Sequence, residues 1–406
     1  MSNIVYPLAS STWGPEEIGA IQKVISTDMY TMGNHVKKFE QEYAERFEVD
    51  HAIMVNSGSS ANLLMFALLK QRYKLTGDVI VPAVGWSTSY YPVNQAGFKL
   101  NFVDVDPNTF NIDVTKIEQA ITPNTCAILA INMFGNSCDY EEIHRIAIKH
   151  NLKVLEDNCE SMGSKFNGRY TGSMGLFDRG TEPPTYGYLG SQSFFFSHHM
   201  QTMEGGMITT DSWEDADYLR SLRAHGWMRD WQGDPEQPGK MIDIGPEKVD
   251  PWKKNFTFVA PGYTVRPLEF SGAIGSEQLK KWDGIMDSRL KNKDYFFEKF
   301  ADQDYLRFQT EIHESSWFTF SCICTGALRG RRDEVVSALT DAGVQSRPMG
   351  AGNWLRQPVL ESMDYIAEGT YEAADEIEDE GFFVGNGLED VTKGIDVMYD
   401  TIQKLL

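Results

Sequence analysis

The sequence of 406 residues has few basic side chains for its length. It contains 37 Lys and Arg against 58 Asp and Glu, which gives a formal net charge of −21 at pH 7. A chain of this charge is repelled by nucleic acids and by anionic membranes, so we expect neither as a partner. A small anionic ligand is not excluded, because a local group of backbone and hydroxyl donors is enough to bind one.

Long apolar stretches are also lacking. No segment approaches the roughly 20 apolar residues that span a bilayer. The first residues, Met1 to Pro7, lack the basic and apolar regions of a signal peptide. We therefore predict a cytoplasmic location.

Cysteines are scarce and odd in number: Cys126, Cys138, Cys159, Cys322 and Cys324. Only Cys322 and Cys324 lie close together, and no second pair accompanies them. This spacing is weak evidence for a metal site. We expect free, reduced thiols, as in a reducing compartment, and no bound metal.

Alternating strand and helix patterns are present instead. Helical periodicity separates short apolar runs at 78–81, 100–104, 127–132 and 152–156. Such alternation predicts an α/β fold with a mostly parallel central sheet that helices cover on both faces.

The length of the chain predicts a second, smaller domain. We expect residues 1–265 to form the large domain with an N-terminal arm. Residues 266–406 then form a bridging helix, expected at 266–290, and a small C-terminal α+β domain.

A small polar turn, Asn56 to Ser60, lies between a short apolar strand and a helix. This order offers backbone N–H groups and hydroxyls to a phosphate at the helix N-terminus. A Ser-rich helix cap is the alternative, and the turn alone favours it.

Two further strand ends carry polar or aromatic side chains. Asp157 follows an apolar strand, and a buried carboxylate there requires a cation or several donors. A protonated pyridine nitrogen is such a cation, although a helix cap or salt bridge is the commoner reason for an Asp at a strand end. Trp86, in the loop after residues 78–81, either stacks on a flat ring or packs in the core.

The most informative stretch runs from Ser193 to Gly206. Its three phenylalanines, Phe194 to Phe196, predict a strand buried on both faces. His198 follows, at the sheet edge where open α/β folds place their chemistry. The four strand ends together suit pyridoxal phosphate (PLP), which needs a phosphate cradle and an acidic partner for its ring. The stretch lacks, however, the Lys that usually binds PLP covalently.

These motifs resemble the DegT–DnrJ type of nucleotide-sugar aminotransferases, which are fold type I (aspartate aminotransferase-like) PLP proteins. The resemblance extends over nearly the whole chain and includes residues 58–64, 156–163, 197–199, 204–206, 223–227, 261–263 and 266–269. Aminotransferases of the family carry Lys at the position of His198. The chain looks like the deoxysugar 3-dehydratases of colitose biosynthesis, which carry His there.

The resemblance assigns a phosphate site. Gly58, Ser59 and Ser193 are expected to bind the cofactor phosphate. Thr264 replaces an Asn with which the neighbouring subunit reaches that phosphate, and Thr keeps one hydroxyl donor. A homodimer with a shared active site is therefore expected.

The resemblance also assigns the residues around the cofactor ring. Trp86 is expected to stack on the ring, Asp157 to pair with its nitrogen, and Glu160 to lie near its phenolic oxygen. His198 is the expected acid and base, because imidazole cannot form the covalent link but has a pKa near neutrality. His199 is expected to be structural or to contact the substrate.

The implied reaction uses noncovalent PLP, its pyridoxamine form (PMP) and L-glutamate as co-substrate. The C3 hydroxyl of a nucleotide-linked 4-keto-6-deoxyhexose leaves, and ammonia and a 4-keto-3,6-dideoxy sugar are released. GDP-4-keto-6-deoxy-D-mannose is the expected substrate.

Three alternatives remain. A nucleotide-sugar aminotransferase would need the Lys that the stretch lacks. A CDP-sugar 3-dehydrase with an iron–sulfur cluster would need extra cysteines, and none lies between Cys159 and Cys322. A non-catalytic ligand-binding homologue is the third. The loop at 176–190 is longer than is usual in the family, and it is either a lid or dimer contact or a surface insertion.

Overall fold

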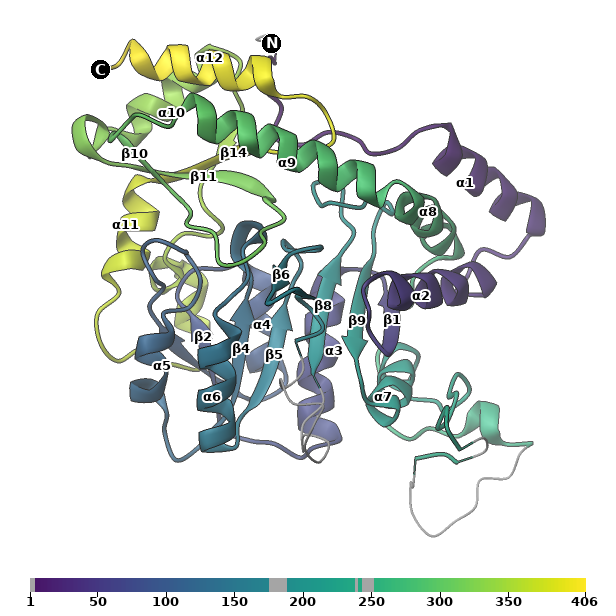
Figure 1. Cartoon of the computed structure of the whole chain (residues 1–406). Helices are drawn as coiled ribbons and strands as arrows, with labels where there is room; N and C mark the ends of the chain where they lie inside the picture. Colours follow the sequence, from purple (N-terminus) through teal and green to yellow (C-terminus); the bar gives the residue numbers. More distant parts are fainter. Residues whose placement is uncertain (1–3, 175–187, 238–239, 243–251) are drawn as a thin grey trace.

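A computed structural model describes residues 4–174, 188–237, 240–242 and 252–406. The central sheet consists of β1 (His51–Val55), β2 (Asp78–Pro82), β3 (Lys99–Val103), β4 (Thr125–Ile131), β5 (Lys153–Asp157), β8 (Leu189–Ser193), β9 (Gly206–Thr210) and β13 (Tyr365–Ile366). The strands lie in the order β1-β9-β8-β5-β4-β2-β3-β13 (Figure 1).

Strand direction confirms the predicted mostly parallel sheet. Every neighbouring pair from β13 across to β8 is parallel, whereas β9 runs antiparallel to both β8 and β1. As a result β1, β2, β5 and β8 point the same way. Their carboxyl ends meet at one edge of the sheet, where open α/β folds bind ligands.

Helices cover both faces of this sheet. They are α2 (Asn34–Arg46), α3 (Gly58–Gln71), α4 (Ser87–Gln95), α5 (Val114–Ala120), α6 (Tyr140–His150) and α7 (Trp213–Arg223). Successive side chains of a strand point to opposite faces. Val79 and Leu129 therefore pack with α3, α4 and α7, whereas Ile80 and Ile128 pack with α5 and α6.

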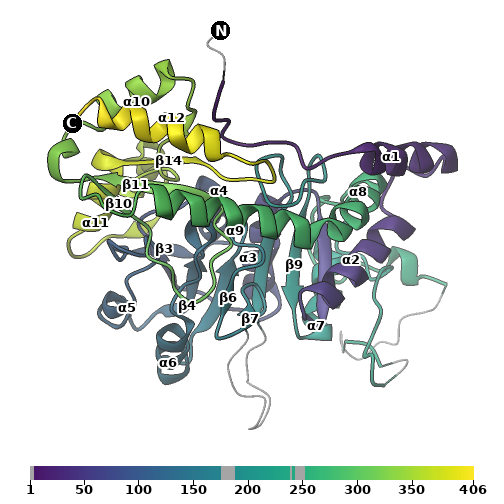
Figure 2. The same ribbon diagram turned by 45° about the horizontal axis from the view of Figure 1, so that its top comes forward.

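A smaller antiparallel sheet follows towards the C-terminus, in the order β10-β11-β14-β12. Its strands are β10 (Leu306–Phe308), β11 (Thr319–Cys324), β12 (Ser346–Arg347) and β14 (Gly381–Gly385). The helices of this region are α8 (Glu269–Lys280), α9 (Trp282–Lys299), α10 (Arg332–Asp341), α11 (Glu372–Glu380) and α12 (Thr392–Gln403). Figure 2 shows α9 and α12 side by side along the small sheet.

The described N-terminal segment and the C-terminal helix α12 both lie on this smaller part (Figure 1). Tyr6 is buried in its core, and the Tyr6 hydroxyl donates to the carbonyl oxygen of Gly385 over 2.6 Å. The N-terminal segment then crosses to α1 (Pro15–Thr27), which packs against α8. The domain division at residues 265 and 266 stays a prediction.

The prediction for the Phe run was wrong. Strand β8 ends at Ser193, whose partner is Gly206, the first residue of β9, so the ladder stops before the run begins. Phe194 is buried, but Phe195 and Phe196 are 46% and 49% exposed. The chain already turns here, since the Thr202 N–H donates to the Phe194 carbonyl.

The single helix predicted at 266–290 was also wrong, because two helices, α8 and α9, meet at Lys281. The Lys281 ammonium reaches Glu17 over 2.7 Å. The next residue, Trp282, turns inward and packs its ring 5.1 Å from that of Phe47. Burial of this indole redirects the chain, which periodicity alone does not reveal.

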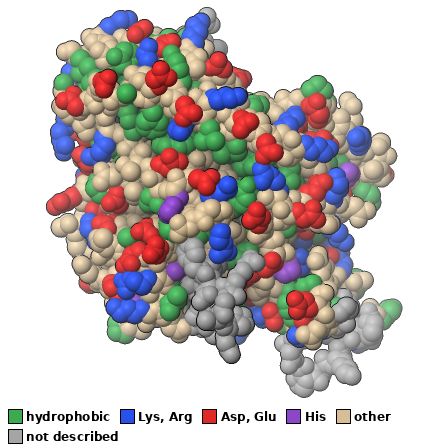
Figure 3. Space-filling model, in the orientation of Figure 1, with side chains coloured by type: hydrophobic (Ala, Val, Ile, Leu, Met, Phe, Trp, Pro, Cys, Tyr) green, Lys and Arg blue, Asp and Glu red, His purple; other side chains and the backbone are tan. Residues whose placement is uncertain are grey.

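Other features of the molecule bear on the predictions. Residues 175–187, most of the loop predicted at 176–190, lie outside the described residues. No helix in the described ranges is long and apolar enough to cross a membrane. All five cysteines are free thiols. Acidic and basic side chains are mixed over the face shown in Figure 3.

Candidate active site

The turn between β1 and α3 forms one side of the site. The Ser57 hydroxyl caps α3 by accepting a hydrogen bond from the Ser60 N–H over 3.1 Å. The Ser59 hydroxyl donates instead to Thr88 Oγ1, 2.9 Å away at the start of α4. Capping therefore accounts for Ser57 but not for Ser59. No acidic residue lies in the first turn of α3, so its helix dipole still favours an anion there.

Gly58 brings this turn against the end of β8. A Cβ atom at Gly58 would lie 2.7 Å from Ser193 Cβ and 2.8 Å from Cys159 Sγ, closer than such atoms approach. Only Gly fits at this position. Gly58 and Ser193, two of the predicted phosphate ligands, are therefore direct neighbours although they are far apart in the sequence.

Asp157 lies at the end of β5 and is 4% exposed. Its Oδ2 atom accepts hydrogen bonds from Ser89 Oγ at 2.6 Å and from Asn62 Nδ2 at 2.8 Å. Its Oδ1 atom accepts from the Cys159 N–H at 3.1 Å and from Ser191 Oγ at 3.4 Å. All four donors are neutral, and no Lys, Arg or His of the described chain forms an ion pair with Asp157.

This arrangement differs from the commoner explanations for an Asp at a strand end. Asp157 caps no helix and forms no salt bridge within the described residues. A buried carboxylate with neutral donors alone costs free energy, which a bound cation offsets.

Trp86 stands between β2 and α4, and its side chain is 58% exposed. Core packing therefore does not explain it. The residues that follow turn towards the site, because Thr88 contacts Ser59 and Ser89 contacts Asp157. The indole thus lies at the rim of the same site.

Glu160 lies three residues beyond Asp157. Its Oε2 atom accepts a hydrogen bond from the Phe134 N–H at 3.1 Å. Burial raises the pKa of Glu160 to about 7; the Phe134 N–H opposes this rise, and the Asp157 carboxylate adds to it. Near neutral pH this side chain can both donate and accept a hydrogen bond.

The turn between β8 and β9 carries His198. Its N–H donates to the Phe195 carbonyl over 2.9 Å, and Ser197 Oγ lies 3.4 Å from His198 Nδ1. The turn is anchored further on, where the Gln201 N–H donates to Gln278 Oε1 on α8 at 3.2 Å. The His198 imidazole thus lies on a turn that hydrogen bonds hold in place at the carboxyl edge of the sheet.

The surroundings of His198 keep its ring neutral. Burial lowers the pKa of His198 to about 4, and the Arg289 guanidinium contributes, whereas the Asp157 carboxylate opposes the shift. A neutral imidazole at pH 7 is able to accept a proton.

His199 is fully buried, and its ring lies 5.6 Å from that of Phe318 and 6.2 Å from that of Trp282. This packing supports the structural alternative for His199.

Thr264 is next to Val265, whose carbonyl accepts a hydrogen bond from the Asn56 N–H, at the start of the predicted phosphate turn, over 3.0 Å. Its side chain is exposed, and Thr264 Oγ1 lies 2.9 Å from His225 Nδ1. The described hydrogen bonds include none between Thr264 and Gly58, Ser59 or Ser193. Its role stays a prediction that requires a second subunit.

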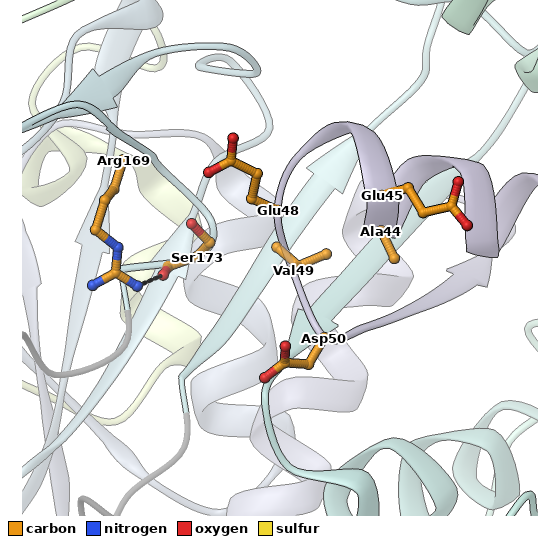
Figure 4. A pocket seen from close by; sticks show the side chains of 7 residues that line it. All are labelled: Ala44, Glu45, Glu48, Val49, Asp50, Arg169 and Ser173. Atoms are coloured by element: carbon orange, nitrogen blue, oxygen red, sulfur yellow. Dashed lines mark hydrogen bonds between the residues drawn. The ribbon is translucent and has the colours of Figure 1, made fainter. Parts of the chain in front are cut away.

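A separate cavity of about 670 Å³ lies at the other end of β1 (Figure 4). It is lined by Ala44, Glu45, Glu48, Val49, Asp50, Arg169 and Ser173. None of the predicted site residues lines it. In Figure 4 the carboxylates of Glu45, Glu48 and Asp50 point in different directions, and Arg169 donates to the Ser173 carbonyl at 2.9 Å.

The residues at the sheet edge fit PLP. The unpaired Asp157 carboxylate matches a protonated ring nitrogen, and the Gly58–Ser193 contact with the nearby Ser59 hydroxyl forms a cradle for a phosphate. The exposed Trp86 indole offers a face for a flat ring. Asn62 and Ser89, which fix Asp157, were not predicted. Asn62 lies one turn after Gly58 on α3, and a buried polar side chain at that spacing is the signal that could have identified it.

Comparison with known proteins agrees with this fit. The sequence profile of the DegT/DnrJ/EryC1/StrS aminotransferase family matches residues 12–386. GDP-4-keto-6-deoxy-D-mannose 3-dehydratase of Yersinia pseudotuberculosis is 44% identical over 406 residues, which cover 99% of each chain.

Solved structures extend the comparison to three dimensions. A mutant of GDP-4-keto-6-deoxymannose-3-dehydratase (ColD) with bound GDP-perosamine superimposes with a TM-score of 0.89 at 43% identity, covering 98% of this chain and 100% of the other. GDP-4-keto-6-deoxymannose-3-dehydratase with a trapped PLP–glutamate geminal diamine also gives 0.89 at 43% identity, covering 98% and 99%. The chain belongs to the DegT/DnrJ/EryC1/StrS aminotransferase family and has its fold type I α/β architecture.

Proposed function

We propose that the protein is a PLP- and L-glutamate-dependent 3-dehydratase. Its proposed substrate is GDP-4-keto-6-deoxy-D-mannose, from which it removes the C3 hydroxyl to give the 4-keto-3,6-dideoxy sugar. The observation that carries this proposal is a neutral imidazole, His198, on the turn where the aminotransferases of the family carry Lys. Relatives that are 44% identical along nearly their whole length are named for this reaction.

Four residues would hold the cofactor ring and its phosphate in this chain. Asp157 would bind the ring nitrogen and keep it protonated, because the carboxylate has no other cation within the described residues. Gly58, Ser59 and Ser193 would bind the phosphate through backbone N–H and hydroxyl groups.

Two further residues, Trp86 and Glu160, would contact the cofactor ring. Trp86 would cover the ring, and Glu160 would share a proton with its phenolic oxygen. When bound, PLP supplies an electron-poor ring that stores the electron pair left by proton removal.

His198 would accept, and later donate, the proton that is removed from the cofactor's methylene group. Ser197 Oγ lies 3.4 Å from Nδ1; in the tautomer that carries its proton on Nδ1, the Nε2 lone pair would be available and would accept the proton. The imidazolium then donates that proton to the departing C3 oxygen, which leaves as water. Imidazole forms no covalent link to the cofactor. Loss of the C3 hydroxyl gives a sugar enamine, which after its release tautomerises and takes up water, so the nitrogen that came from L-glutamate leaves as ammonia and is not retained on the sugar.

The proposal includes a homodimer with a shared site. Phe195 and Phe196 are exposed beside His198, and exposed apolar side chains at a site rim suit a subunit contact. Thr264 would reach the cofactor phosphate of the second subunit. We also place the reaction in the cytoplasm, since five free thiols suit a reducing compartment.

A product assay tests the proposed reaction. The purified protein is incubated with PLP, L-glutamate and GDP-4-keto-6-deoxy-D-mannose, and 2-oxoglutarate, ammonia and the sugar mass are followed. Loss of the C3 oxygen with release of ammonia is expected. An amino sugar formed without ammonia would instead identify an aminotransferase, and PLP binding without turnover would point to another nucleotide sugar or to a ligand-binding protein. Light scattering of the same sample should give twice the mass of the chain.

A further inference from the structure

Arg289 is a buried charged side chain to which the proposed function assigns no role. It lies in the middle of α9 and is 3% exposed. Its Nη1 atom donates to the carbonyl oxygens of Trp317 and Phe318, at 3.2 Å each, and its Nε atom is buried without a partner. Among the described residues no carboxylate forms an ion pair with it. Burial of an unpaired guanidinium costs free energy, so this position is not explained by stability alone.

The two carbonyl groups belong to a strained turn. Trp317 has a φ of 46°, in the left-handed region that is unfavourable for a bulky side chain. The Trp317 carbonyl also accepts a hydrogen bond from Asn386 Nδ2 at 2.8 Å. Arg289 and Asn386 therefore fix the same turn, one with a charged donor and one with a neutral donor.

This turn packs against the imidazole of His198. The Phe318 ring lies 5.3 Å from the ring of His198 and 5.6 Å from that of His199. Because Arg289 donates a hydrogen bond to the Phe318 carbonyl, the position of the guanidinium and the position of the Phe318 ring are linked.

The titratable groups that face His198 come from three elements, and two of these groups are charged. Arg289 on α9 lowers the pKa of His198, and Asp157 on β5 raises it. His199 is coupled to His198 within the turn itself. Ser197 is a further polar neighbour, with its Oγ atom 3.4 Å from Nδ1. Burial lowers the pKa of Arg289 to about 9, so the guanidinium remains charged at neutral pH.

We infer that Arg289 is a positioning residue for His198, because it fixes the Phe318 ring against the imidazole and sets a positive charge behind that ring. The inference rests on the proposed function, in which His198 is the acid and base. The charge favours the neutral imidazole that can accept a proton. The hydrogen bonds of the guanidinium hold the ring in the geometry that proton transfer needs.

Three variants separate charge from geometry. Arg289→Gln removes the charge, Arg289→Lys keeps the charge but loses the planar guanidinium, and Asn386→Ala removes the neutral donor to the same carbonyl. The readout is the titration midpoint of His198 in PLP-loaded protein, measured by NMR with labelled histidine. The chain has eight histidines, and the signal missing in His198→Asn identifies His198.

The expected results differ between the variants. In Arg289→Gln the His198 midpoint rises by about one pH unit or more, and the acid limb of the kcat/KM profile moves with it. In Arg289→Lys the midpoint stays near the wild-type value while kcat falls on the order of tenfold through misplacement. In Asn386→Ala the midpoint does not move.

An unchanged midpoint in Arg289→Gln would overturn the inference, and so would a shift in Asn386→Ala as large as that in Arg289→Gln. If Arg289→Gln does not fold, Arg289→Lys carries the test, and a raised midpoint there refutes the role of the charge. The titration needs no turnover. Absence of dehydratase activity in the wild type would therefore refute the proposed function, and the NMR result would still decide the role of Arg289.

Discussion

Replacing Asp157 by Asn tests the part of the site that is proposed to hold the cofactor ring. In the free protein the carboxylate is 4% exposed and accepts hydrogen bonds from neutral donors only. The substitution removes an unpaired buried charge. The Asn62 amide, whose Oδ1 atom has no partner, can flip to accept from the new amide, and the Ser89 hydroxyl can turn to accept as well. We expect the free energy of unfolding of the free protein to change by no more than about 1 kcal/mol.

The cofactor complex should respond differently. With PLP bound, Asp157→Asn loses a charge-assisted hydrogen bond to the ring nitrogen, a bond that contributes about 1.5–3 kcal/mol. This corresponds to a PLP dissociation constant raised roughly 10- to 150-fold. The constant is measured by titrating the protein with PLP and following absorbance, and thermal melts with and without PLP report the loss independently.

Glu156 provides a matched control for this experiment. It precedes Asp157 on β5, is equally buried, and points to the opposite face, where Oε2 and Oε1 accept from the Gly172 and Met174 N–H groups at 2.6 and 2.9 Å. Glu156→Gln should bind PLP as tightly as the wild type. An Asp157→Asn protein whose PLP dissociation constant stays within about threefold of the wild-type value, a change worth less than about 0.7 kcal/mol, would refute the reasoning.

Three other substitutions have defined outcomes. Gly58→Ala places a Cβ atom 2.7 Å from Ser193 Cβ. We expect this overpacking to lower the free energy of unfolding in urea by about 1–3 kcal/mol and to weaken PLP binding. A variant with wild-type stability and PLP affinity would contradict the proposed phosphate site. Trp86→Ala should leave the melting temperature nearly unchanged, because the indole is 58% exposed, yet weaken PLP binding about 3- to 10-fold, and a large loss of stability would instead indicate a packing role. Burial raises the pKa of Glu156 to about 7 from 4.5, so this side chain binds more protons in the native state than in the unfolded state, and its contribution to wild-type stability falls as pH rises through about 7. Relative to the wild type, Glu156→Gln should gain ~2 kcal/mol between pH 5 and pH 8, and parallel pH profiles of the two proteins would show that Glu156 titrates normally.

The sequence predicted those parts of the fold that depend on local patterns. Apolar runs alternating with helical periodicity were enough for the mostly parallel sheet, because each strand and helix carries its own signal. The Phe run and the 266–290 segment misled because their outcome depends on distant partners. The pairing of β8 with β9 stops at Ser193, because its partner Gly206 is the first residue of β9. Trp282 turns inward and packs against Phe47, which separates α8 from α9.

The candidate site shows the same limit. Asp157 could be identified because a polar residue directly follows an apolar strand. Its partners Asn62 and Ser89 lie 95 and 68 residues away and became visible only when α3 and α4 were placed on the sheet. Arg289 carries no local signal, since one Arg in an amphipathic helix is normally at the surface.

The central claim is that His198 is the acid and base of a PLP-dependent dehydratase. The most direct test compares wild type and His198→Asn for two quantities, PLP affinity and the rate of ammonia release with GDP-4-keto-6-deoxy-D-mannose and L-glutamate. We predict a PLP dissociation constant within about threefold of wild type, because His198 forms no covalent link to the cofactor. The rate should fall by about 10²- to 10⁴-fold. Ammonia release by His198→Asn at the wild-type rate would contradict the account.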